Sequence, residues 1–152
     1  MERINKILSL FIETLHKRER KNLVRITKTD KTGIQYNHEL FLQLLNYVDG
    51  LTIEKDGRSI DFRLSIVDNN YIILASIKNN IIAIDLSKKN EADEWDIITL
   101  NNHFVITKTI GSFFTNKIWA WIDRGRTIWK EETKDSPTHL ERKKGHCVPD
   151  PV

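Results

Sequence analysis

The chain of 152 residues contains one cysteine, Cys147, and three prolines, all of which follow residue 136. A single cysteine excludes a disulfide within the chain and a zinc site built from several cysteines. The longest apolar runs have five residues, whereas a membrane-spanning helix needs about 20 apolar residues. The first residues lack the uninterrupted apolar segment and the cleavage site of a secretory signal. These absences favour a cytoplasmic protein with no membrane partner.

The short motifs of common enzyme classes are missing as well. The chain has no nucleotide-binding glycine loop, no Gly-x-Ser-x-Gly elbow and no His-Glu-x-x-His zinc motif. Asp61, Asp68 and Asp85, with Lys88 nearby, are the carboxylates that a metal-dependent nuclease would use. They fall at strand ends or on a polar face, where lone carboxylates are common. We therefore expect no enzyme, no catalytic residue, no metal and no cofactor.

The charge of the chain is unevenly distributed. Lys and Arg number 24 against 21 Asp and Glu, a net charge of +3. Residues 1–31 carry a net charge of +5, residues 32–123 carry −4, and residues 124–152 carry +2. The two ends are therefore basic and the central part is acidic. This distribution favours a basic protein partner over a nucleic acid.

Two N-terminal segments have the periodicity of amphipathic helices. Residues 2–19 place an apolar stripe opposite a charged face. A second helix follows Asn37, a favourable N-cap, and ends before Gly50, which suits the left-handed position after a helix. Residues 23–26, between the two, favour a short strand.

From residue 51 the apolar period changes to two, which predicts an antiparallel meander of about six strands. Asp56 and Gly57 predict a two-residue hairpin turn between the first two strands. Segments 71–76 and 81–86 are apolar at nearly every position. We expect these two strands to be central and covered by helices.

A closing helix completes the domain, with Ser112 as its expected N-cap and its end near Gly125. Helices, a meander sheet and a closing helix packed on the sheet predict an α+β fold in a single domain, residues 1–130. Residues 131–152 are polar, contain every proline and predict a disordered tail. This tail also holds residues able to bind an adventitious metal, with no scaffold to fix their geometry: His139, His146 and Cys147.

Three local segments resemble the SUKH superfamily, which groups fungal cell-wall-synthesis regulators with bacterial toxin-immunity proteins. A leucine-rich helix ends on residues 45–50, a strand pair covers residues 72–75 and 81–87 and closes with Asp-Leu-Ser, and residues 110–114 open the last helix. The resemblance spans roughly residues 37–122. It implies a SUKH-like protein-binding module, an immunity protein that caps and inhibits a specific polymorphic toxin without cofactor or chemistry of its own.

An acidic loop is the predicted partner-binding surface. Its residues lie close together where the loop enters a strand: Glu91, Asp93, Glu94, Trp95 and Asp96. Acidic side chains would steer a basic toxin domain, such as a nuclease with a cationic groove. Trp95 would supply an aromatic anchor, since Trp is enriched at interface hot spots. The alternative is a solvated loop with Trp95 turned into the core.

A basic cluster at the end of the first helix supports the alternative function, binding of RNA or DNA: Lys17, Arg18, Arg20 and Lys21. Neutralising phosphates requires such a cluster, preferably with aromatic side chains for stacking. No aromatic residue lies between Phe11 and Tyr36. This gap favours a solvated helix end as the competing interpretation.

Three of the four tryptophans lie close together in the sequence: Trp119, Trp121 and Trp129. Trp121 fits the apolar stripe of the closing helix with Ile118 and Ile122. Trp119 points elsewhere, so it is either a second core contact or an exposed docking residue.

Overall fold

The computed structural model describes residues 2–128. Its elements, in chain order, are α1 (Glu2–Arg20), β1 (Arg25–Lys28), α2 (Glu39–Tyr47), β2 (Leu51–Lys55), β3 (Arg58–Phe62), β4 (Ser65–Val67), β5 (Tyr71–Ile77), β6 (Asn80–Asp85), β7 (Ile97–Thr99), β8 (Val105–Thr107), α3 (Ile110–Ser112), the π-helical segment η1 (Phe113–Lys117) and α4 (Ile118–Arg124). The last three form one continuous helical run. The predicted tail, residues 131–152, lies outside the described residues, as does Trp129.

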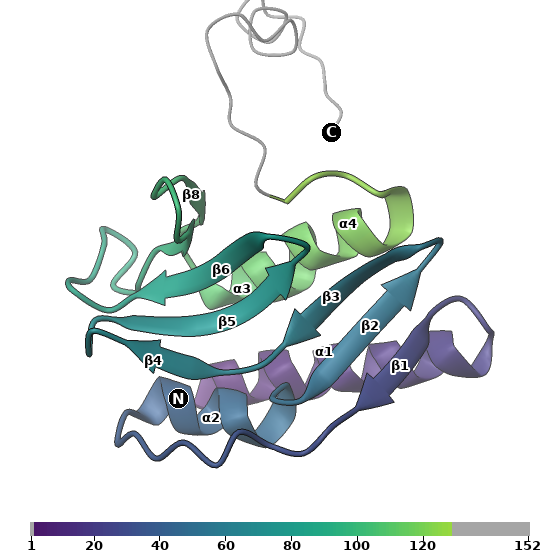
Figure 1. The fold of residues 1–152 in the computed structure, drawn as a ribbon, viewed down its shortest axis with the longest axis horizontal. Coiled ribbons are helices and arrows are strands. Elements are labelled where there is room, and N and C mark those ends of the chain that lie inside the picture. The colour runs from purple at the N-terminus through teal and green to yellow at the C-terminus, as the bar shows by residue number, and fades with distance from the viewer. Residues whose placement is uncertain (1, 129–152) are drawn as a thin grey trace, which may run out of the picture.

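All eight strands form one antiparallel sheet in the order β1-β2-β3-β5-β6-β7-β8, and β4 pairs with β5. The closing helix packs on this sheet (Figure 1), which confirms the predicted α+β class. The sheet has eight strands where the sequence predicted about six. One reason is that the segment at residues 25–28 joins the sheet as an edge strand, antiparallel to β2.

The second reason is a break in the strand that follows the Asp56-Gly57 turn. The buried carboxylate of Asp49 accepts the backbone N–H of Leu64 at 2.9 Å and that of Thr32 at 2.8 Å. An N–H group bound to a side chain is not available to a neighbouring strand. The strand therefore divides into β3 and β4, with Leu64 between them.

Helices cover only one face of the sheet (Figure 1). The central strands β5 and β6 share a register shift between Ile73 and Ala75, and they send these side chains into the core: Ile72, Leu74, Ala75, Ile82 and Ile84. Four apolar residues next to these along each strand face the other way: Tyr71, Ile73, Ile81 and Ala83. The central position of β5 and β6 is as predicted. Helices cover one apolar face of these two strands. The other face is also apolar, but no helix covers it.

An aromatic cluster joins the N-terminal helix to the sheet and to the closing helix. The ring of Phe11 lies 6.4 Å from that of Phe62, 4.9 Å from that of Phe114 and 5.4 Å from that of Trp119. Trp121 is buried, and Trp119 packs half-buried against the core. Trp119 is therefore a core contact, which settles the choice left open by its sequence position.

Turn and cap positions agree in part with the sequence. Asp56 and Gly57 have φ values of 52° and 79°, as the predicted hairpin turn requires, and Gly125 ends α4 with φ 68°. Two predicted N-caps are wrong by one and three residues. His38, not Asn37, caps α2, and Thr109, not Ser112, caps the closing helix by accepting the N–H of Ser112.

Among residues 2–128, no helix combines the length and the apolar character that a membrane-spanning helix requires.

Replacing Gly50 tests the close approach that joins α2 to the sheet. Gly50 has φ +82°, and a Cβ there would lie 2.6 Å from the backbone oxygen of Thr29. Gly33 has φ +76° with open space around it, so Gly33→Ala is a matched control. We expect Gly33→Ala to cost about 1 kcal/mol of unfolding free energy from the left-handed backbone. Gly50→Ala should cost about 1–3 kcal/mol more, because backbone atoms must move. Urea denaturation measures both, and equal losses would contradict the close approach.

Candidate functional site

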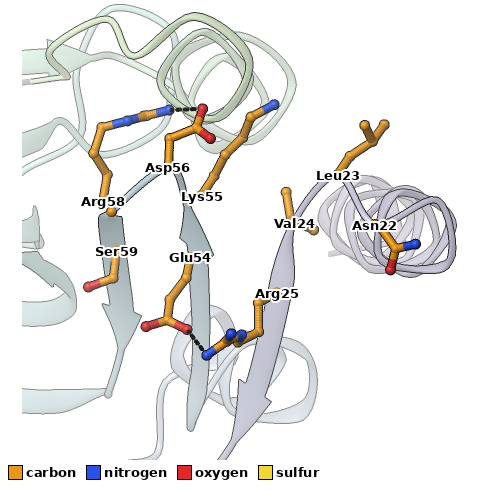
Figure 2. Close-up of a pocket in the computed structure, with 10 residues that line it drawn as sticks. Asn22, Leu23, Val24, Arg25, Glu54, Lys55, Asp56, Arg58 and Ser59 are labelled. Carbon is orange, nitrogen blue, oxygen red and sulfur yellow. Dashed lines mark ion pairs between the residues drawn. The ribbon is translucent and has the colours of Figure 1, made fainter.

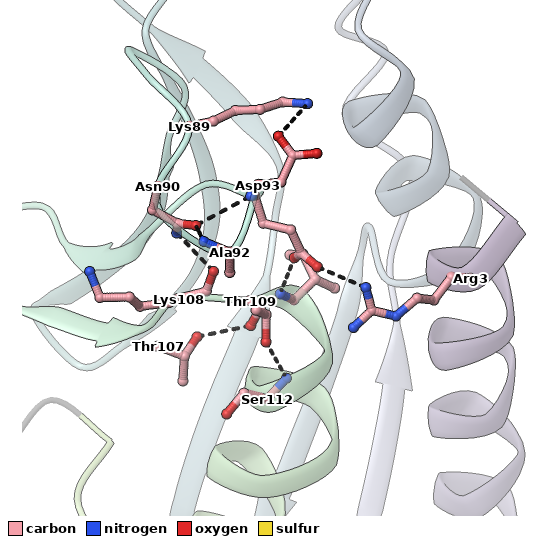
Figure 3. A network of polar contacts seen from close by, with 11 residues as sticks. Arg3, Lys89, Asn90, Ala92, Asp93, Thr107, Lys108, Thr109 and Ser112 are labelled. Carbon is pink, nitrogen blue, oxygen red and sulfur yellow. Dashed lines mark hydrogen bonds and ion pairs between the residues drawn. The ribbon is translucent and has the colours of Figure 1, made fainter.

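The acidic loop between β6 and β7 is organised by the side chain of Asn90 (Figure 3). Its Oδ1 accepts the N–H groups of Ala92 at 2.8 Å and Glu94 at 3.2 Å. Its Nδ2 donates to Asp96 Oδ1 at 2.8 Å and to the carbonyl oxygen of Lys108 at 2.9 Å. The amide thus closes the loop on itself and ties it to the segment that follows β8. The structure therefore brings all five predicted residues together on one ordered loop.

Glu94 has a structural role in this loop. Its Oε1 accepts the backbone N–H of Ile110 at 2.9 Å, at the start of the closing helix. Its Oε2 forms an ion pair with Arg3 of α1 at 3.2 Å (Figure 3), and its side chain is only 12% exposed. A carboxylate at a helix N-terminus is stabilised by the unpaired N–H groups and the helix dipole. Glu94 therefore links the loop to both the first and the last helix.

The other carboxylates of the loop also have partners within the chain. Glu91 and Asp96 lie 3.3 and 3.9 Å from Nζ of Lys108, and Asp93 lies 3.7 Å from Nζ of Lys89. Hydrogen bonding to its own backbone N–H and the nearby Lys108 ammonium hold the pKa of Glu91 below its ordinary value. The loop is therefore anionic, but its field is partly neutralised by its own lysines.

Trp95 lies half-buried against the core, beside the N-terminus of α2. Its ring is 5.2 Å from that of His38 in an edge contact, and Nζ of Lys89 lies 5.0 Å above it. His38 accepts the N–H of Leu40 through Nδ1 at 3.2 Å. Burial lowers the pKa of His38, Glu39 opposes this and Lys89 adds to it. The sequence-based alternative, in which Trp95 turns inward, describes its packing.

The four basic residues predicted for nucleic-acid binding have different surroundings in the structure. Arg18 pairs with Asp123 of α4 and lies 4.4 Å above the ring of Trp119. Lys17, Arg20 and Lys21 have no ion-pair partner within residues 2–128. Arg18 thus helps to hold α1 against α4, and the other three remain available for a ligand.

A polar groove of about 580 Å³ lies beside this cluster and was not predicted (Figure 2). It runs between residues 22–25, which join α1 to β1, and residues 54–59, at the tip of the β2–β3 hairpin. Arg25 pairs with Glu54 at 3.6 Å across it, and Arg58 pairs with Asp56 at 4.0 Å. Its walls are some 30 residues apart in sequence, so no local pattern indicates it.

The open face of the sheet carries a second feature that sequence reasoning missed. Cross-strand pairs connect Ile73 to Ala83, Ala83 to Ile98 and Ile98 to Val105. We call these four residues the apolar row. Ile98 and Ala83 are buried but stand apart from the main core, and Val105 is 38% exposed. The sequence signal was present, since segments 71–76 and 81–86 are apolar at nearly every position.

The open face is polar on its other half, over β1, β2 and β3. Thr27 pairs with Thr52, Thr52 with Asp61, and Asp61 with Ser76. Thr52 donates a hydrogen bond to Asp61 at 2.6 Å. The face therefore changes from polar to apolar across the middle of the sheet.

The carboxylates considered for a nuclease do not gather into a metal site. Asp61 lies on the open face, Asp68 in the turn before β5, and Asp85 at the end of β6, where it accepts the N–H and the hydroxyl of Ser87. Within the described part of the chain, no three His, Cys, Asp or Glu residues are grouped to hold a metal ion.

The chain matches no protein-family model, no curated protein and no solved structure.

Removing the carboxylate of Glu94 tests its role as a link between helices. Glu94→Ala deletes the acceptor for the Ile110 N–H and the ion pair to Arg3, which should lower the unfolding free energy by about 2 kcal/mol. Glu91→Ala is the matched control in the same loop, because its side chain is exposed and its ion pair is solvated. Chemical denaturation should show a loss for Glu94→Ala alone. Equal stability of the two variants would contradict a structural role for the Glu94 side chain.

Titration of His38 should couple stability to pH. The pKa of His38 is lower in the folded chain than its ordinary value, so the unfolded state binds the proton more tightly. The cap is then complete above the unfolded pKa of about 6.5 and weakens as the pH falls below it. His38→Asn keeps an N-cap acceptor that does not titrate. Between about pH 7.5 and about pH 5.5, a range that brackets the unfolded histidine pKa, the melting temperature of His38→Asn should fall less than that of the original chain. Parallel pH curves would contradict the coupling.

Proposed function

We propose that this chain is a non-catalytic protein-binding module of the SUKH type, an immunity protein that binds a basic toxin domain and blocks its active site. The three segments that resemble SUKH proteins fall on the end of α2, on β5 and β6, and on α3. The apolar half of the open sheet face is the observation that carries the proposal.

An apolar row on an open sheet face favours a protein partner. Tyr71 and Ile81 lie on the same face and widen the apolar row, and both are half-buried. Tyr71 is held by His103, whose Nε2 lies 3.3 Å from the tyrosine hydroxyl. Contiguous apolar surface rimmed by polar residues marks interaction sites, and anchored aromatic residues are typical of interface centres.

The charge at the border of this surface favours a basic partner. Asp85 pairs with Tyr71 across the strands, and its N–H donates to the carbonyl oxygen of Asp96 at 2.9 Å. The acidic loop therefore starts and ends beside the apolar half. Glu91 and Asp93, whose side chains are 73% and 87% exposed, extend the negative border. Such charges accelerate association with a basic domain and orient it.

The mechanism is occlusion. A domain seated on the open face would cover the partly exposed apolar residues Tyr71, Ile73, Ile81 and Val105. It would also place the acidic loop at the edge of its cationic active site. Binding energy would come from the apolar centre, while the loop carboxylates would supply specificity and association rate. Glu94 and Trp95 would contribute by holding the loop in place. No proton or group transfer is involved.

The proposal makes a genetic and a biochemical prediction. The coding sequence should lie beside that of a large multidomain toxin, and the purified C-terminal domain of that toxin should form a stable complex with this chain. Ile81→Lys with Val105→Lys places two cations on the apolar half. This change should weaken the complex at least about tenfold, because hot-spot contacts contribute 2 kcal/mol or more.

Thr27→Lys with Ser59→Lys is the matched control. It adds the same two charges to the polar half of the same face and should leave affinity nearly unchanged. Titration calorimetry measures the affinities, and thermal melts check that both variants fold. Equal weakening by both pairs, or a coding neighbourhood without any toxin, would overturn the proposal.

A further inference from the structure

One end of the molecule collects cations from three separate parts of the chain. Arg58 of the β2–β3 hairpin donates to the carbonyl oxygens of Trp121 and Ile122, and Arg18 of α1 pairs with Asp123. These contacts bring together the ends of α1 and α4 and the tip of the hairpin (Figure 1). Nine cations lie on these segments: Lys17, Arg18, Arg20, Lys21, Arg25, Lys55, Arg58, Arg124 and Arg126. Four carboxylates accompany them: Glu19, Glu54, Asp56 and Asp123.

Three of the four carboxylates at this end pair with an arginine, and the fourth lies near a histidine that is charged only when protonated. Asp123 pairs with Arg18, Glu54 with Arg25 and Asp56 with Arg58, and Glu19 lies 3.8 Å from His16. Five cations have no ion-pair partner within residues 2–128: Lys17, Arg20, Lys21, Lys55 and Arg124. Five unpaired cations against the single carboxylate of Glu19 leave this end with an excess of positive charge. In the acidic loop, by contrast, each carboxylate is paired with a lysine or an arginine, so the negative charge of the loop is partly neutralised.

The groove in Figure 2 lies among these cations. Arg25, Lys55 and Arg58 come from its walls, and Arg58 is held rigidly, with its guanidinium 5.0 Å from the ring of Trp121. Exposed side chains along the groove are polar or charged, apart from Leu23. The lining residues include no aromatic side chain. A polar concavity lined and bordered by cations suits phosphate oxygens better than the apolar centre of a protein interface.

We propose that this basic end binds the phosphate backbone of a double-stranded nucleic acid. Lysines and arginines at the rim would neutralise phosphates on either side of the groove, without reading base edges. A duplex is favoured over a single strand, because single-strand binding depends on exposed aromatic residues on which bases stack. This site is separate from the apolar half of the open face, and its test does not require the toxin partner.

The test is the salt dependence of duplex binding by the full chain. Fluorescence anisotropy with labelled duplexes of DNA and of RNA should give binding that weakens steeply as salt rises. If four or five phosphates are contacted, log K against log salt should have a slope of about −4, since each contributes about −0.9. A DNA-only or RNA-only result would identify the duplex and still support the site.

Lys17→Ser with Lys21→Ser and Lys55→Ser removes three of the unpaired cations. The slope should become shallower by about three, and affinity at low salt should fall at least about 30-fold. The matched control removes three lysines elsewhere in the molecule that have no ion-pair partner within residues 2–128: Lys6, Lys88 and Lys117. It changes the net charge equally and should alter the slope by less than about one.

Four outcomes would overturn the proposal. They are the absence of duplex binding at low salt, an equal loss in the control variant, tighter binding of a single strand of the same length, and binding of polyglutamate as tight as that of the duplex. The third would assign the surface to single strands, and the fourth to an acidic protein. Retained complex formation with the toxin domain by the triple variant would separate this site from the protein-binding face.

Discussion

The packing of Phe11 against Phe62, Phe114 and Trp119 is the contact on which the arrangement of the molecule depends. One side chain of the first helix thereby touches the sheet and the last helical run together. It holds α1 and the closing helix on the same face of the sheet. Because α1 and the closing helix both pack on that face, no helix covers the opposite face of the eight strands.

The two surfaces of functional interest follow from this one-sided packing. The open face carries the apolar row beside the acidic loop, and parallel alignment of α1 and α4 brings their basic C-terminal ends together with the β2–β3 hairpin. Protein recognition and polyanion recognition are thereby assigned to different regions. The first depends on apolar area, and the second on uncompensated charge.

Local chemistry was predictable where the residues concerned are close in sequence. The apolar stripe of α1, the Asp56-Gly57 turn and the end of α4 at Gly125 all follow from steric preferences within a few residues. Predictions failed where a distant group competes. Asp49 takes the N–H of Leu64 and divides a predicted strand, and Glu94 supplies a cap for Ile110 that residues next to the helix do not reveal.

The candidate site shows the same limit. Sequence spacing placed the acidic residues of the loop together correctly. It did not reveal that Glu94 points inward to Arg3, or that Lys108 and Lys89 compensate Glu91 and Asp93. Ion pairs between residues far apart in sequence have no periodic signature. The amount of free charge on a surface is therefore a tertiary property.

The sequence by itself determined the α+β class, the order of helices and strands, the exclusion of a disulfide within the chain and the uneven distribution of charge. Periodicity and composition are local properties of the sequence, so these features can be predicted without knowledge of the fold. Only the tertiary structure decided which face of the sheet is covered, which charges remain uncompensated and where the groove lies. Each of these depends on contacts between segments that are far apart in the sequence. Only the packing of side chains in the folded chain brings such segments together.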